Sequence, residues 1–242
     1  MDNKNLYLSG EYLKKNHSYH KEDSEFKWQN LIDILKKTSF NFDKINSIVD
    51  IGCGSGQVLV EAKKSNVFKN QCSFEGYDIN PEAIKLAKNN SDQISFFNED
   101  FIKNNTDIKK DIIIAADVFE HIQDPYNFLK ELKNKGNFFL FNIPLEISLL
   151  SMIRKKNIYK HSYKNVGHLH FYNKRTSLLL LESVGFKVLN HNLVNNRFEE
   201  LKVKKKITSL LINIPQYITE IFNKNIASSV FGGYSLVVLA KK

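Results

Sequence analysis

Histidine and carboxylate side chains that could move protons gather in two short stretches of the chain. One reads Asp117-Val118-Phe119-Glu120-His121-Ile122, and the other reads Gly167-His168-Leu169-His170-Phe171. Imidazole titrates near neutral pH, so a histidine can take the proton from a hydroxyl group that is to become a nucleophile. The candidates for that base are His121, His168, His170 and, more distantly, His20. His121 has a structural alternative, in which it hydrogen-bonds to backbone at the end of a strand.

These residues do not predict a metal centre. If the second stretch is extended, His168 and His170 share one face, but no third ligand lies at a recognised zinc spacing. The two cysteines, Cys53 and Cys72, are too few for a disulfide framework and form no metal-ligand cluster. We therefore expect no bound metal, and a reducing, cytoplasmic environment.

A glycine-rich turn after an apolar run is the feature around which the chain is organised. The stretch 47–57 reads SIVDIGCGSGQ, with glycines at every second position: Gly52, Gly54 and Gly56. A strand, a glycine turn and a helix together place backbone N–H groups and a positive helix end beside a ligand. A dinucleotide-binding turn would have its third glycine at Gln57. Asp50 would oppose a pyrophosphate, so the turn favours a cationic ligand over a dinucleotide.

Two further acidic positions follow the next two predicted strands. Asp78 ends the strand 73–78, about twenty residues past the glycine turn, where a carboxylate accepts hydrogen bonds from ribose hydroxyls. Asn80 and Pro81 then start a helix, so Asp78 is not needed as its cap. Asp100-Phe101 follows the strand 94–97.

These motifs resemble those of class I S-adenosylmethionine (SAM) methyltransferases, in which an acidic residue precedes G-x-G-x-G. The resemblance implies SAM as cofactor and S-adenosylhomocysteine (SAH) as product. It also implies that Asp78 binds both ribose hydroxyls, while Asp100 lies near the adenine amino group with Phe101 against the ring. The expected cofactor-binding residues are Asp50, Gly52, Cys53, Gly54, Gly56, Asp78, Ile79, Asp100, Phe101, Asp117, His20 and Lys27.

The same resemblance extends to both proton-transfer stretches and to the N-terminus. A D/E-x-x-E-H-I/V run lies at the pocket mouth in this family, and G-H-x-H/R-F-Y/F places its first histidine toward the pocket. This favours His168 over His170 as base or substrate ligand. The run 19–24 resembles the opening of some methyltransferases from surface-polysaccharide gene clusters, which implies a segment that folds over the cofactor. Asp23 or Ser24 could instead simply cap the following helix.

Alternating apolar runs predict the architecture. We expect strands at 47–51, 73–78, 94–97, 111–116, 137–143, 186–193 and 234–240, and helices at 25–37, 125–132, 176–184 and after the first two strands. Such alternation gives an α/β, doubly wound, Rossmann-like sheet with ligands at the carboxyl ends of the strands. The resemblance adds an antiparallel last strand. We expect one domain over 1–242, with an N-terminal helical lid at 1–46 and cap insertions at 145–172 and 194–231.

The first insertion is rich in cationic and aromatic residues, which suggests an anionic acceptor. The expected substrate-binding residues are Arg154, Lys155, Lys156, His161, Tyr163 and Tyr172, with Tyr19 and His20 from the N-terminal run. The second insertion carries an apolar helical stripe, 207–222, after Lys204–Lys206. Pro215 interrupts this stripe and predicts two short helices. They would pack on the sheet or form a dimer face; contact with a membrane surface is the weaker alternative.

Composition and absent motifs narrow the function. The 242 residues are 42% hydrophobic and carry a net charge of +9, but the lysines are spread along the chain. Nucleic acid is disfavoured as substrate, because Asp124-Pro125-Tyr126 lacks the second proline of amino-methylating DNA enzymes and lies too late. The polar N-terminus leads us to expect no signal peptide, and no apolar run approaches the length of a membrane span. The chain is expected to be a monomer or a homodimer.

The expected activity is methyl transfer to a small polar, anionic metabolite. An oxygen of a phosphorylated or nucleotide-linked cell-surface precursor is favoured by the polysaccharide-cluster resemblance. A small-molecule N-methyltransferase is the nearest rival. A non-catalytic SAM-binding module, or a membrane-surface module, is the alternative from another class.

Overall fold

A computed structural model describes residues 23–103, 109–154, 158–197 and 207–242, with the backbone alone for 207–212. The expected site residues Tyr19, His20, Lys155 and Lys156 lie outside the described residues.

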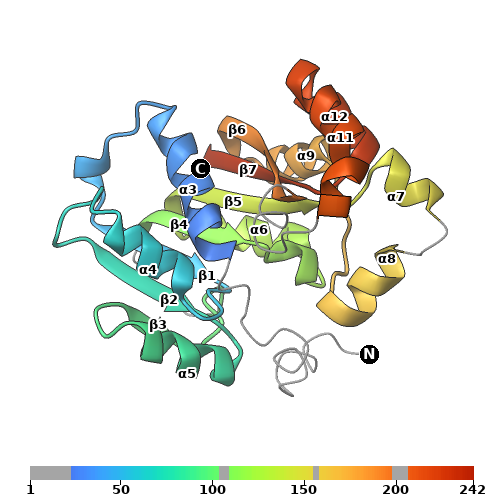
Figure 1. The fold of residues 1–242 in the computed structure, drawn as a ribbon. Helices are drawn as coiled ribbons and strands as arrows, with labels where there is room; N and C mark the ends of the chain where they lie inside the picture. The colour runs from blue at the N-terminus through green and yellow to red at the C-terminus, as the bar shows by residue number, and fades with distance from the viewer. Residues whose placement is uncertain (1–22, 104–108, 155–157, 198–206) are drawn as a thin grey trace.

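A seven-stranded sheet forms the centre of the described structure (Figure 1). Its strands are β1 (Ser47–Ile51), β2 (Ser73–Tyr77), β3 (Ser95–Phe97), β4 (Lys110–Ala116), β5 (Gly136–Leu145), β6 (Lys187–Asn195) and β7 (Tyr234–Lys241). The order is β3-β2-β1-β4-β5-β7-β6. The first five strands are parallel, and β7 runs antiparallel to both of its neighbours. The predicted Rossmann-like sheet with an antiparallel last strand is confirmed.

Helices cover both faces of this sheet. One face carries α3 (Ser24–Lys36), α4 (Gln57–Lys64) and α5 (Pro81–Asn90), and the other carries α6 (Pro125–Leu132), α9 (Lys174–Val184) and α12 (Lys224–Phe231). Side chains alternate across a strand, so β4 serves both layers. Ile112 and Ile114 join one core cluster, while Ile113 and Ala115 join the other. The uninterrupted apolar sequence of β4 therefore reflects its central, two-sided burial.

The fifth strand is longer than predicted. The sequence placed its end at Ile143, before Pro144, but β5 continues to Leu145. Pairing with β4 stops at Asn142, so Pro144 lies beyond that neighbour and pairs only with Ser235 of β7. A proline is tolerated there because its missing N–H is not needed on the open side.

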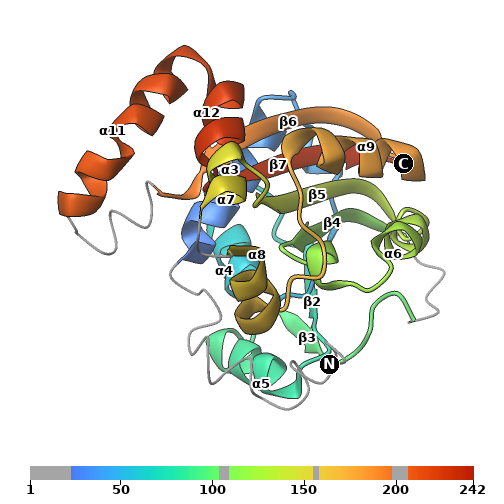
Figure 2. The same ribbon diagram turned by 90° about the vertical axis from the view of Figure 1, so that its right-hand side faces the viewer.

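The two segments predicted as caps both contain helices. The first holds α7 (Leu149–Ile153), α8 (Ile158–His161) and a π-type turn, η4 (Ser162–Val166). The second holds α11 (Ile207–Phe222) and α12, and Figure 2 shows α11 extending away from the sheet beside α12.

The prediction that Pro215 splits α11 is wrong, since the helix continues through it. Arg197 bonds to residues on both sides of the proline: its Nη1 donates to Asn213 Oδ1 at 2.9 Å and to Gln216 Oε1 at 2.8 Å. These contacts hold the two halves in line despite the lost backbone bond.

The described part of α11 turns its polar side inward. Gln216 is buried, whereas Ile221 and Phe222 are more than 80% exposed. The expectation that the stripe packs on the sheet is therefore wrong for these two residues, and a dimer face or membrane contact stays a prediction. In the part of the chain that the structure describes, no helix is long and apolar enough to cross a bilayer.

Candidate functional site

The glycine turn is held against the second strand by backbone bonds. Gly52 and Cys53 both donate their N–H groups to the carbonyl oxygen of Tyr77, at 2.8 and 3.1 Å. Gly56 precedes α4 with φ +73°, and a Cβ added there would lie 2.4 Å from the ring of Phe96. Only glycine fits such a position. The turn therefore brings the N-terminus of α4 to the carboxyl end of the sheet, where the sequence predicted a ligand.

Two buried carboxyl groups flank this turn. Burial raises the pKa of Asp50 to about 8, opposed by the positive charge of Lys27 and reinforced by Asp78 and Asp117. Asp78 accepts hydrogen bonds from the N–H groups of Gly54, at 2.9 Å, and Asn80, at 2.8 Å. Burial also raises the pKa of Asp78. Such sites favour a ligand that brings positive charge or hydroxyl donors.

Asn80 caps α5 as predicted, since its Oδ1 accepts from the N–H of Glu82 at 2.9 Å. The carboxylate of Asp78 is therefore not part of that cap. Cys53 is buried, and burial raises the pKa of its thiol. This side chain fills space in the turn and is unsuited to act as a nucleophile.

The third acidic position lies at the end of the sheet, but its aromatic neighbour does not face outward. Asp100 accepts a hydrogen bond from the N–H of Ile102 at 3.1 Å. Phe101 is 2% exposed and packs edge-on against Tyr77, with ring centroids 4.9 Å apart. The expected contact of Phe101 with a cofactor ring is thus not supported, because its ring belongs to the core. Ile79, 37% exposed, is the apolar side chain available beside Asp78.

A cavity of about 360 Å³ opens near the carboxyl ends of β4 and β5. Its walls come from α3, the segment after β4, the carboxyl ends of β5 and β6, the η4 region and the start of β7. The lining residues are Asp23, Phe26, Lys27, Asn30, Asp117, Glu120, His121, Asn142, Pro144, Val166, His168, Val194, Asn196 and Ser235. The predicted residues Lys27, Asp117, His121 and His168 are among them.

An ion pair joins α3 to the end of β4 and links the cavity to the glycine turn. Lys27 Nζ lies 2.7 Å from Asp117 Oδ2, and Asn142 Nδ2 donates to Asp117 Oδ1 at 2.8 Å. Asp117 has φ +57°, an unusual backbone conformation for a residue other than glycine. Since the charges of Lys27 and Asp117 also act on Asp50, the cavity and the turn form one electrostatic site.

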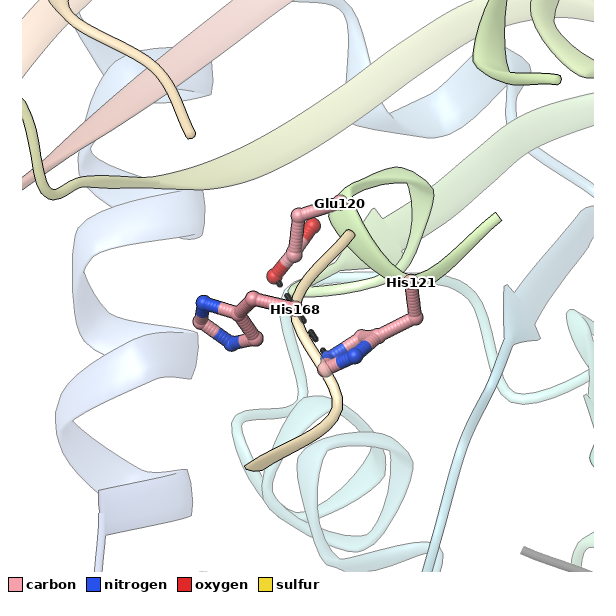
Figure 3. Close-up of side chains that lie close together, drawn as sticks. All are labelled: Glu120, His121 and His168. Carbon is pink, nitrogen blue, oxygen red and sulfur yellow. Dashed lines mark ion pairs between the residues drawn. The ribbon is translucent and has the colours of Figure 1, made fainter. Parts of the chain in front are cut away.

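Two histidines that line the cavity lie close together (Figure 3), and a hydrogen bond through Nδ1 orients each of them. His121 Nδ1 donates to the carbonyl oxygen of Gly167 at 3.1 Å, and His168 Nδ1 donates to Glu146 Oε2 at 2.6 Å. Nδ1 is the donor in both bonds, because a carbonyl oxygen and a carboxylate oxygen can only accept a hydrogen bond. The two rings lie 4.7 Å apart, edge to face. Burial lowers the pKa of His121 to about 4, so this ring is neutral at physiological pH.

Glu120 lies beside these rings and was not predicted as a site residue. It is fully buried, and burial raises the pKa of its carboxyl group well above the usual value, with a further rise from Asp117. The sequence signal was its position next to His121. Glu146, which holds His168, was also missed; its position just past β5 was the available signal.

The other predicted residues of the first insertion are not brought into the cavity. Arg154, His161 and Tyr163 are exposed and are not among the lining residues. Tyr172 is buried in the core against Phe119, with ring centroids 5.4 Å apart. The expected substrate contacts of these four residues are therefore not supported, nor is a role for His170, which lies outside the cavity lining.

The comparisons with known proteins identify the family. A family model described as a methyltransferase domain matches residues 21–191. A protein of Methanocaldococcus jannaschii, named as a proposed protein N5-glutamine methyltransferase, is 28% identical over 193 residues, covering 75% of this chain and 87% of that protein. Ribosomal protein L11 methyltransferase of Haemophilus influenzae is 30% identical over 107 residues, covering 41% of this chain and 34% of that enzyme.

Solved structures show the same fold. Magnesium protoporphyrin IX methyltransferase of Synechocystis, solved with bound SAH, has a TM-score of 0.57 at 12% identity, covering 90% of this chain and 83% of that one. A chain from the complex of a Haloferax volcanii methyltransferase with its Trm112 activator has a TM-score of 0.63 at 14% identity, covering 97% of this chain and 95% of that one.

The residues at the glycine turn fit SAM. Asp50 and Asp78 are buried acidic groups beside a turn in which a Cβ at Gly52 or Gly56 would clash, and a cation with ribose hydroxyls suits both.

Replacing Asp78 with alanine should weaken SAH binding by about 1.5–3 kcal/mol, the range for hydrogen bonds to a charged group. Calorimetry with SAH measures this loss. Asp92→Ala, at an exposed position, is the matched control and should bind SAH normally. Unchanged binding by Asp78→Ala would remove Asp78 from the cofactor site.

The family match spans well over half of the chain, and the sheet order, the glycine turn and the acidic positions agree with it. The chain belongs to the methyltransferase-domain family and is a SAM-dependent methyltransferase.

Proposed function

We propose that the enzyme methylates a hydroxyl oxygen of a small polar acceptor that enters the cavity of Lys27, Asp117, Glu120, His121 and His168. The observation that carries this proposal is the pair of oriented histidines beside a buried carboxyl group in the cavity wall. A hydroxyl must lose its proton to become a good nucleophile, whereas a neutral amine needs only to be positioned. The site has three side chains that can take part in proton transfer, so it suits a hydroxyl group as the methyl acceptor.

SAM supplies a methyl group already activated by its sulfonium centre. The chain's own residues hold the acceptor and handle its proton. Glu146 fixes the ring of His168 with Nδ1 as donor, which leaves Nε2 for a ligand in the cavity. If Nε2 takes the proton of the substrate hydroxyl, or holds a cation beside it, the hydroxyl oxygen becomes more nucleophilic. Loss of His168 removes both routes.

The cavity lining narrows the expected class of acceptor. A phosphate group needs cations, but among the described lining residues the cation is Lys27, which already pairs with Asp117. We propose that the part of the acceptor inside the cavity is hydroxylated and uncharged. If the acceptor is a phosphorylated or nucleotide-linked surface precursor, its phosphate lies outside this cavity.

N-methylation is the second candidate, because carboxyl groups outnumber cations in the lining. The lining contains three carboxyl groups, from Asp23, Asp117 and Glu120, and one lysine. Such an excess of acidic groups would attract an ammonium group. The relative from Methanocaldococcus jannaschii, named for transfer to a glutamine nitrogen, adds to this alternative.

Incubating the enzyme with methyl-¹³C SAM and a small-molecule extract of its source cells separates the two candidates. Mass spectrometry finds the labelled product, and NMR distinguishes an O-methyl from an N-methyl carbon. We expect an O-methyl product of low molecular mass. A label on nitrogen would contradict O-methylation and support N-methylation of an amine instead.

The start of α3 should respond to the cofactor. Asp23 and Lys27 line the cavity, and Asp23 precedes α3 without a side-chain capping bond to that helix. If segment 19–27 folds over the cofactor, its amide hydrogen exchange should slow when SAH is added. Peptides from α9 on the opposite face provide the internal control. Equal exchange in 19–27 with and without SAH would contradict a lid at this position.

A further inference from the structure

Three side chains of metal-ligand type meet in the cavity wall. One possible ligand atom from each of Glu120, His121 and His168 lies within 4.8 Å of the other two. His121 Nε2 lies 3.9 Å from Glu120 Oε1. Figure 3 shows the carboxyl group of Glu120 and the two imidazole rings side by side. Glu120 and His121 belong to the turn after β4, and His168 belongs to the segment after η4.

The carboxyl group of Glu120 lacks the partners that a buried acid requires. Neither of its oxygens has a hydrogen-bond partner among the described residues, although the side chain is 0% exposed. The charges of Asp117 and Glu146 disfavour its ionised form, whereas its own backbone N–H and the charge of Lys27, which pairs with Asp117, favour that form. A buried carboxylate without a partner is costly, so the site is built for a proton or for a cation that enters the cavity.

Both histidines have the hydrogen bonds that metal-binding histidines usually have. The Nδ1 of His168 donates to a carboxylate, Glu146, and the Nδ1 of His121 donates to a backbone carbonyl, Gly167. These are the two partners that most often fix the tautomer of a metal-binding histidine and turn its Nε2 toward the metal. The carboxylate of Glu146 is itself held by the hydroxyl of Ser162. The outer contacts of such a site are thus in place.

We propose that Glu120, His121 and His168 bind a divalent transition-metal cation of the Zn²⁺ class. Two imidazole nitrogens and one carboxylate oxygen suit such a cation better than Mg²⁺ or Ca²⁺, which prefer oxygen ligands. Metal–ligand bonds of about 2.0–2.2 Å in tetrahedral geometry put neighbouring ligand atoms roughly 3.3 Å apart. The 3.9 Å between His121 Nε2 and Glu120 Oε1 is close to that separation. The sequence did not predict this site because it paired His168 with His170, whereas the fold pairs it with Glu120 and His121.

A cation at this point deepens the proposed function and rests on it for its chemical role. Three protein ligands leave a fourth position open to the cavity, where the acceptor hydroxyl would bind. The cation lowers the pKa of that hydroxyl, and its proton leaves to solvent. The oxygen then forms a bond to the methyl carbon as the carbon–sulfur bond breaks. The electron pair of that bond stays on sulfur, which yields neutral SAH.

Zinc binding can be measured without acceptor, so its failure is separate from failure of the proposed function. The full chain is stripped with a chelator and titrated with ZnCl₂ by calorimetry, and metal content is checked by mass spectrometry. We expect about one equivalent of Zn²⁺ per chain, as for a single three-ligand site. Glu146→Gln should lower the affinity by about 10- to 100-fold, the range for losing an outer partner. Glu120→Gln and His168→Ala remove ligands and should have larger effects.

His161→Ala is the matched control, because His161 is exposed and bonds to Asn165 rather than to the cavity cluster. It should bind Zn²⁺ as the wild type does, and circular dichroism should show that every variant is folded. Zinc should also raise the melting temperature of the wild type but not of Glu120→Gln. Unchanged zinc affinity in both Glu120→Gln and His168→Ala would overturn the proposal, as would displacement of Zn²⁺ by an equal concentration of Mg²⁺.

Discussion

Replacing His168 with alanine is expected to lower methyl transfer by about a hundredfold or more while leaving SAH affinity nearly unchanged. His168 lines the cavity and is held by Glu146 at 2.6 Å, whereas the glycine turn and Asp78 lie in other segments. The variant therefore loses activation of the acceptor but keeps the cofactor site. Initial rates with labelled SAM and the acceptor found by the extract screen give the first quantity, and calorimetry with SAH gives the second.

Two further variants make this result specific. Glu146→Gln keeps a hydrogen-bond acceptor near His168 but removes the charge, so it should be slower than wild type and faster than His168→Ala. His161→Ala, at an exposed position outside the cavity, should retain normal turnover. Near-normal turnover by His168→Ala would exclude a central role for this residue and make His121 the first alternative. A loss of SAH binding equal to the loss of rate would show a structural effect instead.

Replacing Gly56 with alanine should destabilise the protein by about 2–5 kcal/mol, from overpacking and left-handed strain together. The added Cβ would lie 2.4 Å and 2.5 Å from two ring atoms of Phe96 and 3.1 Å from the Cβ of Ala87. Both neighbours belong to the buried core, so neither can move freely. For a chain of this size the melting temperature should fall by about 5–15 °C.

Gly185→Ala is the matched control for strain without overpacking. Its φ is +90°, but an added Cβ would meet only the flexible end of Lys133, at 2.7 Å. This variant should lose only about 1 kcal/mol. Thermal unfolding followed by circular dichroism measures both. Equal losses in the two variants would mean that the contact between Gly56 and Phe96 contributes little.

The fold could be predicted because its signals are local. The apolar run of β4, the glycine turn before α4 and the Asn80-Pro81 start of α5 each depend on neighbours in sequence. The antiparallel β7 came from the family resemblance, since strand order depends on long-range pairing. The predicted break at Pro215 was wrong because the helix around this proline is held by Arg197, a residue far from it in sequence.

The site was predictable only where one motif carries it. Lys27, Asp117, His121 and His168 were predicted from short patterns, and the structure places all four in the cavity lining. Glu146 and the grouping of Glu120 with His168 depend on how η4 folds back over the end of β4, where the N–H of Leu169 donates to the carbonyl of Glu120 at 2.8 Å. The motif at Phe101 predicted a contact with the cofactor, but the ring of this residue faces the core.

The central claim is that the cavity of Glu120, His121 and His168 is the acceptor site next to the cofactor. A crystal structure with SAH tests this most directly. We predict SAH along Gly52–Gly56 and Asp78, with its sulfur facing the cavity and within reach of a ligand at His168. SAH bound elsewhere, or with its sulfur directed away from this cavity, would contradict the account.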